Sequence, residues 1–490
     1  MWPTSVGIDG ATSSMACTCY PQYATMTSNP AIVQLKPFLQ PFPYGRNGMD
    51  SWAAQYALET PSLKKSVEKD GGIKKDQPYG EIWLGSTHQN GPCYVEGQDL
   101  SLKDLIKKDP SFYLGSKLQS DKQMTSQYPD DLPFLFKVLS FDKPLPLQCH
   151  PDKKLGEQLM QQEKKQEGKN ENFVDSNAKP EVGVALSPFT AFVGFRPLEP
   201  LQNLIKSVPE FGELFQDSTL SSFYKTASSS PSDADAKAAL RSLFYEAINL
   251  PEAKVKDLTS RLSARLEKEG AEAVFGAANQ YQAKGKANAS GESEAAAMAR
   301  VWKISTSTYG ESDPGSLVAT TLMNVLRMEK GEGAWILADD LHAYVEGDII
   351  ECMANSDNMV AHGLGTEEQG GISTFVEMLS YRHLPPSDLL LKYEDKWSKG
   401  KNGRTRRYDV PINEFDLLSI SLSSSSPTEE LSYLDGPLTY VLTEGTVITT
   451  VAGEKLELSK GQAGFVRAGV DIKFEAKNGQ PAELWGAFYQ

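Results

Sequence analysis

The sequence predicts a mainly β protein of the α+β class with a helical insertion. Short apolar runs bounded by turn residues recur between residues 33 and 198, and again from residue 333 to the end. Between them, residues 199–300 are rich in Ala, Leu, Glu, Lys and Gln with a period of 3.6 residues, which predicts helices. Because 490 residues are too many for one hydrophobic core, we expect two or three domains.

Composition excludes several classes of function. The net charge of −15 argues against a nucleic-acid partner, which would favour a basic face. No apolar run is long enough to cross a bilayer. The five scattered cysteines are odd in number, which indicates a reducing compartment such as the cytoplasm. Residues 1–29 lack the features of a secretory signal and predict a disordered tail, in which Met26 is an alternative start.

The first strands carry charged residues among apolar neighbours. Residues 77–85 predict a strand with one carboxylate, Glu81, and residues 133–140 predict a buried strand with one lysine, Lys137. A lysine in that setting either extends to the surface or lies in a functional cavity. Gln148 and His150 lie two residues apart on an extended segment, so their side chains point to the same face.

The next two strands lead into the helical insertion. Residues 177–186 predict a strand with Lys179 and Glu181 at its beginning, and residues 187–197 predict an apolar strand that ends in a turn. The insertion follows and is expected to pack as a separate helical unit. Residues 316–327 predict one more helix before the strands return.

The stretch from residue 337 to 354 contains a lone histidine, a Gly-Asp pair and a β-branched run with one carboxylate. We interpret it as a β-hairpin that turns at residues 346–348. His342 and Glu351 would then lie on rigid strands, where a preorganised site is best built. Taken alone, His342 is more simply a half-buried, hydrogen-bonded residue.

The C-terminal part predicts short strands with glycine turns, at residues 439–451 and 463–469, after a Ser-rich loop. This pattern is typical of a small all-β barrel or sandwich. It contains no histidine, so we expect no metal there. Elsewhere, His150, His342 and Glu181 could form the two-histidine, one-carboxylate arrangement of many catalytic zinc sites. They lie far apart in the sequence, so their spacing alone does not establish the site.

Five motifs occur in one order that resembles the type I phosphomannose isomerases. They are Pro-Phe-Leu-Phe-Lys137-Val-Leu, Gln148-Cys-His150-Pro-Asp-Lys, Lys179-Pro-Glu181, Gly194-Phe-Arg-Pro and His342-Ala-Tyr-x-x-Gly-Asp-x-x-Glu351-Cys-Met-Ala. The resemblance covers the chain from about residue 33 to its end. It implies a zinc enzyme built on cupin-like (jelly-roll) β-barrels that interconverts mannose 6-phosphate and fructose 6-phosphate and thereby supplies GDP-mannose and glycan synthesis.

The resemblance also implies the site and the domains. Its zinc (Zn²⁺) ligands fall on Gln148, His150, Glu181 and His342. We expect a metal-bearing cupin-like domain from residues 30–198 and 311–385. The helical insertion would span residues 199–310, and a metal-free cupin-like β domain would span residues 386–490. We expect a monomer that acts on a small-molecule sugar phosphate, without nucleic-acid or membrane partners.

Aldose–ketose isomerisation moves a proton between C1 and C2 through an enediolate. Cationic side chains and a metal can stabilise the developing negative charge, and a carboxylate or lysine of tuned pKa can carry the proton. Glu351, Lys137 and Lys179 are the candidates, and Tyr344 could orient a hydroxyl. The sequence leaves the identity of the base open.

The chain departs from the family pattern at three positions that serve the substrate's phosphate. Pro146 replaces a serine, Ala361 an arginine and Glu367 a lysine. These changes predict weakened phosphate binding. They support an alternative hypothesis, in which the chain is a metal-retaining paralogue with an altered sugar substrate or a non-catalytic sugar-binding or regulatory role. His362 and Arg382 are the first residues that could replace the lost cation.

Overall fold

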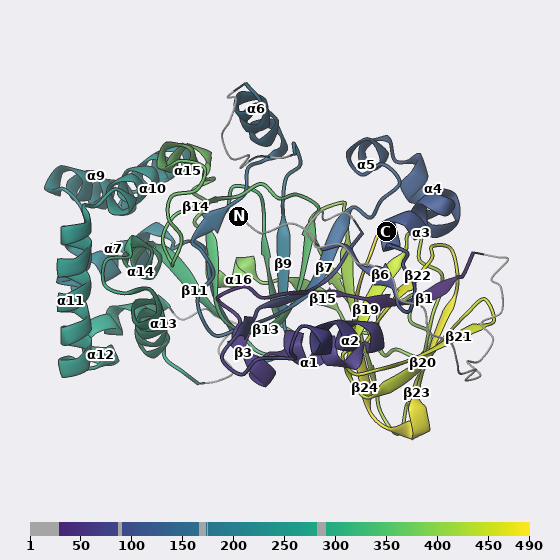
Figure 1. Cartoon of the computed structure of the whole chain (residues 1–490). Coiled ribbons are helices and arrows are strands. Elements are labelled where there is room, and N and C mark those ends of the chain that lie inside the picture. The colour runs from purple at the N-terminus through teal and green to yellow at the C-terminus, as the bar shows by residue number, and fades with distance from the viewer. Residues whose placement is uncertain (1–28, 87–90, 166–172, 174, 282–290) are drawn as a thin grey trace, which may run out of the picture. The chain divides into compact units, whose positions relative to one another are not determined.

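The computed structural model describes residues 29–86, 91–165, 173, 175–281 and 291–490 (Figure 1). Ala31–Gln490 forms one compact unit, and the fold below is the fold of that unit. The expected tail, residues 1–29, lies almost wholly outside the described residues, and so does Met26. No helix in the described part of the chain is long and apolar enough to cross a membrane.

One long strand, β13 (His342–Ala354), lies in the middle of a ten-stranded antiparallel sheet and pairs with strands on both sides. The predicted hairpin at residues 346–348 is wrong, because the chain continues through them as a single strand. Both halves of β13 find partners on other strands, so neither folds back on the other. Gly347 permits this path: it has a φ of 147°, and a Cβ there would lie 3.1 Å from the Cα of Phe189.

The other strands of this sheet come from both sides of the helical segment. They are β2 (Phe38–Gln40), β5 (Glu81–Leu84), β7 (Phe134–Phe141), β8 (Gln148–Cys149), β9 (Glu181–Ala185), β10 (Phe189–Phe195), β11 (Met323–Met328), β12 (Gly333–Ile336) and β14 (Val360–Ala361). The strands predicted at residues 133–140, 177–186 and 187–197 correspond to β7, β9 and β10. All eight residues of β7 are buried, including Lys137.

The chain between β10 and β11 is helical, as its periodicity predicts. Its elements are α7 (Leu198–Ser207), α8 (Pro209–Gly212), α9 (Asp217–Ala227), α10 (Asp233–Ile248), α11 (Glu252–Glu269), α12 (Ala271–Phe275), η2 (Gly276–Tyr281), α13 (Glu294–Tyr309) and α14 (Pro314–Leu322). Side-chain caps begin several of them: Ser232, Ser293 and Asp313 each accept a hydrogen bond from a backbone N–H in the first turn.

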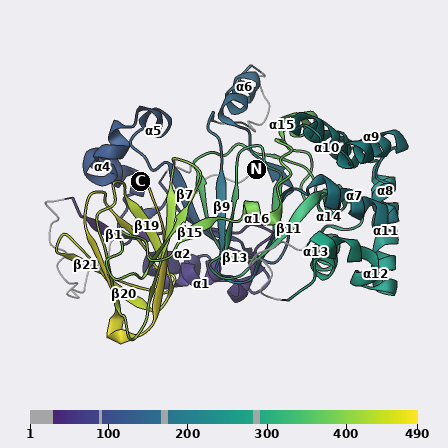
Figure 2. The ribbon, with the colours of Figure 1, turned by 180° about the vertical axis from the view of Figure 1, so that it is seen from behind.

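These helices do not pack as a separate unit. Figure 1 and Figure 2 show them gathered beside β11, and their apolar side chains share one core with residues of the sheet, including Cys149, Phe192 and Ala343. The helix predicted at residues 316–327 ends at Leu322, and the rest of that segment is β11. Packing against β10 therefore outweighs local helical periodicity at this boundary.

The remaining helices and one short strand pair lie outside the segment between β10 and β11 in the sequence. They are η1 (Gly48–Asp50), α1 (Trp52–Glu59), α2 (Pro61–Lys69), α3 (Leu102–Lys108), α4 (Pro110–Ser120), α5 (Lys122–Gln127), α6 (Lys153–Glu163), α15 (Ile372–Met378), α16 (Pro386–Leu389), β3 (Arg46–Asn47) and β4 (Pro78–Tyr79).

Two further antiparallel sheets contain the C-terminal strands. The eight-stranded sheet contains, in spatial order, β15 (Lys392–Glu394), β16 (Thr405–Asp409), β17 (Asp416–Leu422), β24 (Ala482–Phe488), β19 (Leu438–Glu444), β22 (Ala463–Val466), β1 (Ile32–Lys36) and β6 (Tyr94–Val95). The four-stranded sheet contains β18 (Thr428–Leu431), β23 (Ile472–Ala476), β20 (Thr446–Val451) and β21 (Glu454–Ser459), and η3 (Lys477–Gly479) follows β23.

The prediction of an α+β fold with a helical insertion is confirmed. One feature was not predicted: β1 and β6, from the N-terminal part, lie in the same sheet as the C-terminal strands. Among the described strands, neither of the two large sheets closes on itself in the pairing order. The proposed domain boundaries stay a prediction.

Candidate metal centre and cavity

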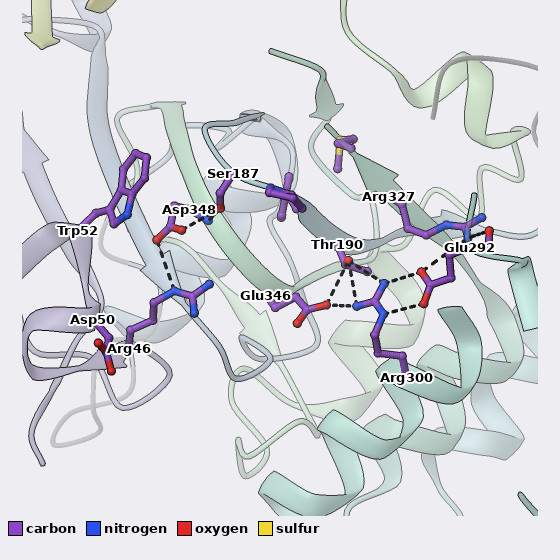
Figure 3. Close-up of a pocket in the computed structure, with 13 residues that line it drawn as sticks. Arg46, Asp50, Trp52, Ser187, Thr190, Glu292, Arg300, Arg327, Glu346 and Asp348 are labelled. Carbon is purple, nitrogen blue, oxygen red and sulfur yellow. Dashed lines mark hydrogen bonds and ion pairs between the residues drawn. The ribbon is translucent and has the colours of Figure 1, made fainter. Parts of the chain in front are cut away.

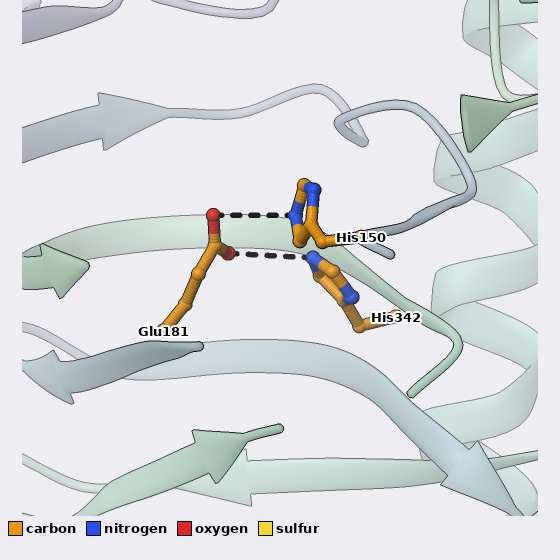
Figure 4. Close-up of side chains that lie close together, drawn as sticks. All are labelled: His150, Glu181 and His342. Carbon is orange, nitrogen blue, oxygen red and sulfur yellow. Dashed lines mark ion pairs between the residues drawn. The ribbon is translucent and has the colours of Figure 1, made fainter. Parts of the chain in front are cut away.

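Two histidines and one glutamate meet where three strands of the ten-stranded sheet begin or end. His150 directly follows β8, Glu181 begins β9 and His342 begins β13. Figure 4 shows each imidazole facing one oxygen of the Glu181 carboxylate, and both Nε2–O distances are 3.3 Å. All three side chains are buried. The structure therefore brings together three residues that the sequence separates widely.

Backbone carbonyls set the orientation of both imidazoles. The Nδ1 of His150 lies 2.8 Å from the carbonyl oxygen of Asn358, and the Nδ1 of His342 lies 3.0 Å from that of Asp340. A carbonyl oxygen can only accept, so each Nδ1 carries a hydrogen and each Nε2 of a neutral ring presents a lone pair. Among the described residues, neither Nε2 atom has a hydrogen-bond partner, although both are buried.

This arrangement fits a metal ion. Two nitrogen lone pairs and a carboxylate point at one another, which is unfavourable unless a cation lies between them. The ligand atoms of the three residues all lie within 4.8 Å of one another. Neutral imidazoles held through Nδ1, together with one carboxylate, are ligands that Zn²⁺ prefers.

The charge states of these residues agree with that role. Burial, followed by the nearby Lys179 ammonium, lowers the pKa of His150 to about 4, so the ring is neutral at neutral pH. Burial alone would raise the pKa of Glu181, but Lys179 and His150 hold it well below its usual range. The Nζ of Lys179 lies 3.4 Å from Oε1 of Glu181. A neutral imidazole and an ionised carboxylate are the forms that bind metal.

Gln148 lies beside this centre. Its backbone pairs with His342 of β13 on one side and with Ala361 of β14 on the other, and its side chain lines the adjoining cavity. The predicted fourth ligand is therefore at the wall of the same site.

A cavity of about 880 Å³ opens next to the three residues. Its lining includes six of the residues that the sequence singles out: Glu81, Lys137, Gln148, Lys179, Glu181 and Glu351.

A chain of buried charges crosses the wall of the cavity. Glu351 of β13 pairs directly opposite Lys137 of β7, and the Lys137 Nζ donates to Oε2 of Glu351 over 2.8 Å. The same Nζ lies 3.5 Å from Oε2 of Glu81. The Glu81 carboxylate also accepts two hydrogen bonds, from the Tyr44 hydroxyl at Oε1 and from the Trp83 indole N–H at Oε2. Lys137 therefore lies in the cavity and does not extend to the surface.

The pKa of Glu351 is raised to about 7, mainly because burial disfavours its charged form. Lys137 opposes this shift, whereas the carboxylates of Glu181 and Glu81 add to it. Burial alone would lower the pKa of Lys137, but Glu351 and Glu81 outweigh burial and raise it. Glu351 can therefore exchange a proton near neutral pH, and Lys137 stays charged.

Tyr344 is not brought into the cavity. Its ring packs against Phe141 and Phe189, and it is not among the residues that line the cavity. Burial and the Glu351 carboxylate raise the pKa of Tyr344 well above its usual value. The geometry gives it no direct contact with a molecule in the cavity.

The three departures from the family pattern lie in different places. Pro146 lines the cavity. Ala361 is 1% exposed and is absent from the lining, and Glu367 is exposed and also absent from it. The expected carboxylate of Glu367 therefore does not face the cavity in this structure.

Several lining residues were missed by the sequence reasoning. Lys143 lies in the turn after β7, and Ser307 and Tyr309 come from the end of α13 in the helical segment. Lys143 lies close enough to the Gln148 motif to have been noticed. The helical residues gave no signal, because surface periodicity does not show which helix end faces a cavity.

A second cavity, of about 740 Å³, is lined by Glu346 and Asp348 of β13 (Figure 3). Its arginines are matched by carboxylates. Arg300 of α13 forms ion pairs with Glu346 and Glu292, and Arg46 lies 3.4 Å from Asp348. These ion pairs connect the helical segment and the N-terminal part to β13.

Comparison with known proteins identifies the relatives of this chain. Residues 32–198 match the family model for the catalytic domain of type I phosphomannose isomerase. Over 469 residues, the chain is 33% identical to a mannose-6-phosphate isomerase of Cryptococcus neoformans, and the match covers 94% of this chain and 100% of the relative. The mannose-6-phosphate isomerase of Saccharomyces cerevisiae is 30% identical, with 90% of this chain and 94% of the relative covered.

Solved structures show the same fold. A mannose 6-phosphate isomerase from Salmonella typhimurium, bound to its substrate and to zinc, matches with a TM-score of 0.69 at 22% identity, covering 94% of this chain and 100% of that one. A zinc-bound mannose 6-phosphate isomerase matches over the same shares with a TM-score of 0.70 at 22% identity.

The fold and the buried centre define a mixed helix-and-sheet protein of cupin-like fold with a site suited to a divalent metal. With relatives this similar over nearly its whole length, the chain belongs to the type I phosphomannose isomerase family.

Proposed function

We propose that this chain interconverts mannose 6-phosphate and fructose 6-phosphate with Zn²⁺ as cofactor. One observation carries the proposal: two imidazoles and the Glu181 carboxylate converge beside a cavity whose wall holds a proton-exchanging carboxylate, Glu351, and a charged lysine. The mannose-6-phosphate isomerases named above are similar over nearly the whole chain, which supports the same reaction.

Gln148, His150, Glu181 and His342 would hold the metal. When bound, the ion supplies positive charge that stabilises negative charge developing on the sugar oxygens. The support for zinc is the chemistry of the donors, with two nitrogens and a carboxylate already oriented by their own hydrogen bonds.

We assign the proton transfer to Glu351. In the open-chain form of mannose 6-phosphate, the carboxylate would remove the proton on C2, giving the enediolate, and return it to C1 as the hydroxyl proton on O2 passes to O1, giving the ketose. A base whose pKa lies near the working pH performs this exchange best. Burial gives Glu351 such a pKa, whereas Lys137 stays protonated and can only stabilise charge.

Lys137 and Lys179 would hold the enediolate oxygens. Lys137 is fixed by two carboxylates and Lys179 by Glu181, so both ammonium groups are oriented before the sugar binds. Preorganised charges of this kind are worth more in a buried site than in water. The mannose 6-phosphate formed would supply GDP-mannose and glycan synthesis in a reducing, cytoplasmic setting.

A coupled assay for fructose 6-phosphate formation tests the proposal. The protein is purified, loaded with zinc and supplied with mannose 6-phosphate, and a chelator-treated sample is the control. Turnover of about 1–10³ per second is expected for the loaded protein. Absence of turnover in a sample that holds stoichiometric zinc would refute the enzymatic proposal.

A second candidate is a metal-retaining paralogue that acts on another sugar or binds sugars without catalysis. Pro146, which has no side-chain donor, and the buried Ala361 favour it, because neither can hold a phosphate. It predicts zinc binding and sugar binding with no turnover of mannose 6-phosphate. The same assay, repeated with unphosphorylated mannose and combined with calorimetry, separates the two candidates.

A further inference from the structure

Charged groups of both signs line the cavity, and most of them are already paired. Lys137 is paired with Glu351 and Glu81, and Lys179 with Glu181. Lys143 lines the same cavity and forms no ion pair with any carboxylate in the described part of the chain. We propose that Lys143 is the cation that binds the substrate's phosphate group, an inference that rests on the proposed function.

The position of Lys143 suits this task. It lies in the turn between β7 and β8, and its Nζ donates one hydrogen bond to the carbonyl oxygen of Pro43 over 3.2 Å. An ammonium group has three donors, so two remain for a ligand. Pro43 lines the same cavity, which keeps the lysine head at its mouth. Glu81, Glu181 and Glu351 are buried, whereas Lys143 is only half-buried.

The C-terminal end of α13 contacts this turn. Tyr309, the last residue of α13, donates a hydrogen bond from its hydroxyl to the carbonyl of Pro144, the residue after Lys143. Tyr309 and Ser307 line the cavity as well. Tyr309 therefore holds the backbone of the turn that carries Lys143, and Pro43 positions the Lys143 side chain.

The loop at residues 363–365 offers no anion site of its own. Its three residues have positive φ angles, a backbone shape whose N–H groups often bind anions. These N–H groups are already used: Leu364 and Gly365 donate to the carboxylate of Asp313 over 2.8 Å each, and Gly363 donates to the carbonyl of Thr366. A carboxylate of the chain therefore occupies the place of an external anion.

The other candidate cations are excluded by their positions. His362 does not line the cavity, and Arg382 does not line it either. The guanidinium of Arg382 is paired with Asp340 and lies over the ring of Trp335. Ala361 and Pro146 carry no side-chain donor. Lys143 is therefore the best-placed group for a phosphate among the residues the structure describes.

A single lysine that binds the phosphate at a solvent-exposed part of the cavity has a characteristic effect on the kinetics. Its effect should appear in KM, because the phosphate is bound in the ground state and the transition state alike. It should weaken as salt rises, since a solvent-exposed charge is screened. A residue that takes part in the chemistry would instead lower kcat at every salt concentration.

The test compares Lys143→Gln and Lys143→Arg with the unchanged, zinc-loaded protein. Lys399→Gln is the control, because the Lys399 Nζ also donates to a backbone carbonyl, that of Tyr433 over 3.0 Å, lies 4.0 Å from Asp435 and is outside the cavity. We expect Lys143→Gln to raise KM for mannose 6-phosphate by about tenfold at low salt, with kcat within about twofold. Lys143→Arg should retain most of the affinity, and Lys399→Gln should change nothing.

Inorganic phosphate provides a readout that does not depend on turnover. Its binding, measured by calorimetry on each zinc-loaded variant, should weaken about tenfold in Lys143→Gln and stay unchanged in Lys399→Gln. If the unchanged protein has no isomerase activity, the proposed function fails and this titration still decides the role of Lys143. Unchanged phosphate affinity and KM in Lys143→Gln, or a loss confined to kcat, would overturn the inference.

Discussion

Glu351 is the residue on which the proposed chemistry depends most. Replacing its carboxylate by an amide keeps the size and the contact with Lys137 but removes the proton acceptor. We expect Glu351→Gln to lower kcat by about 10²- to 10⁴-fold with little change in zinc content. Glu346→Gln is the matched control, since Glu346 lies on the same strand but lines the other cavity. Equal losses in both variants would point to strand damage and not to proton transfer.

The raised pKa of Glu351 predicts a pH dependence. The residue must be ionised to accept a proton, so kcat/KM should be constant above its pKa and fall about tenfold for each pH unit below it. With a pKa of about 7, the decline should begin near neutral pH and not near the ordinary value for glutamate of 4.5. A profile measured from pH 5 to 9 checks this, and a flat profile down to pH 5 would contradict it.

His342 should be essential for holding the metal. Its Nε2 is buried and points at Glu181, with no other partner among the residues that the structure describes, so His342→Ala removes one of the converging donors. Zinc content after dialysis should fall from near one per chain to well below one. His383→Ala is the control, because His383 lies outside the cluster and its Nδ1 lies 3.2 Å from the carbonyl of Tyr381. Full zinc retention in His342→Ala would refute the site.

At the scale of elements, the sequence predicted β7, β9 and β10 well, because each is a short apolar run with clear turn residues at its ends. It failed at β13, where a Gly-Asp pair reads as a hairpin turn. Local sequence cannot show that both halves of this strand have partners elsewhere, or that Phe189 comes too close to residue 347 for a Cβ to fit easily there. The pairing of β1 with β22 is equally invisible, since it joins the two ends of the unit.

The sequence predicted those residues of the candidate site that lie in strands or directly beside them. His150, Glu181 and His342 stand out as polar residues in apolar strands, and the family motifs place them together. Lys143 and Tyr309 could not be placed, because a turn and a helix end are positioned by tertiary contacts and not by periodicity.

The loop at residues 363–365 should depend on Asp313, the N-cap of α14. One carboxylate accepts hydrogen bonds from the N–H groups of Gly315, Leu364 and Gly365. Asp313→Ala should lower the free energy of unfolding by about 1–3 kcal/mol and raise KM, because the loop lines the cavity. Ser232→Ala, which removes the cap of α10, should cost about 1 kcal/mol without changing KM. Urea unfolding and steady-state kinetics measure both.

For the whole molecule, the metal should contribute to stability as well as to chemistry. Without a cation, two buried nitrogen lone pairs face a carboxylate at the junction of three strands. A ligand that binds only the folded state stabilises it by about 2.7 kcal/mol at a concentration 100 times its Kd. A chelator should therefore lower the Tm of the unchanged protein by several degrees, and the effect should disappear in His342→Ala. An unchanged Tm would mean that the ion does not stabilise the fold.

The most direct test of the proposed activity is to follow mannose 6-phosphate by NMR in D₂O with the zinc-loaded protein and with zinc-loaded Glu351→Gln. The proposed function predicts that the unchanged protein forms fructose 6-phosphate, with any deuterium gained from solvent appearing at C1. Glu351→Gln, holding the same amount of zinc, should form product more slowly by the factor predicted for kcat. Formation of product at the same rate by both proteins, or by neither, would contradict the proposal.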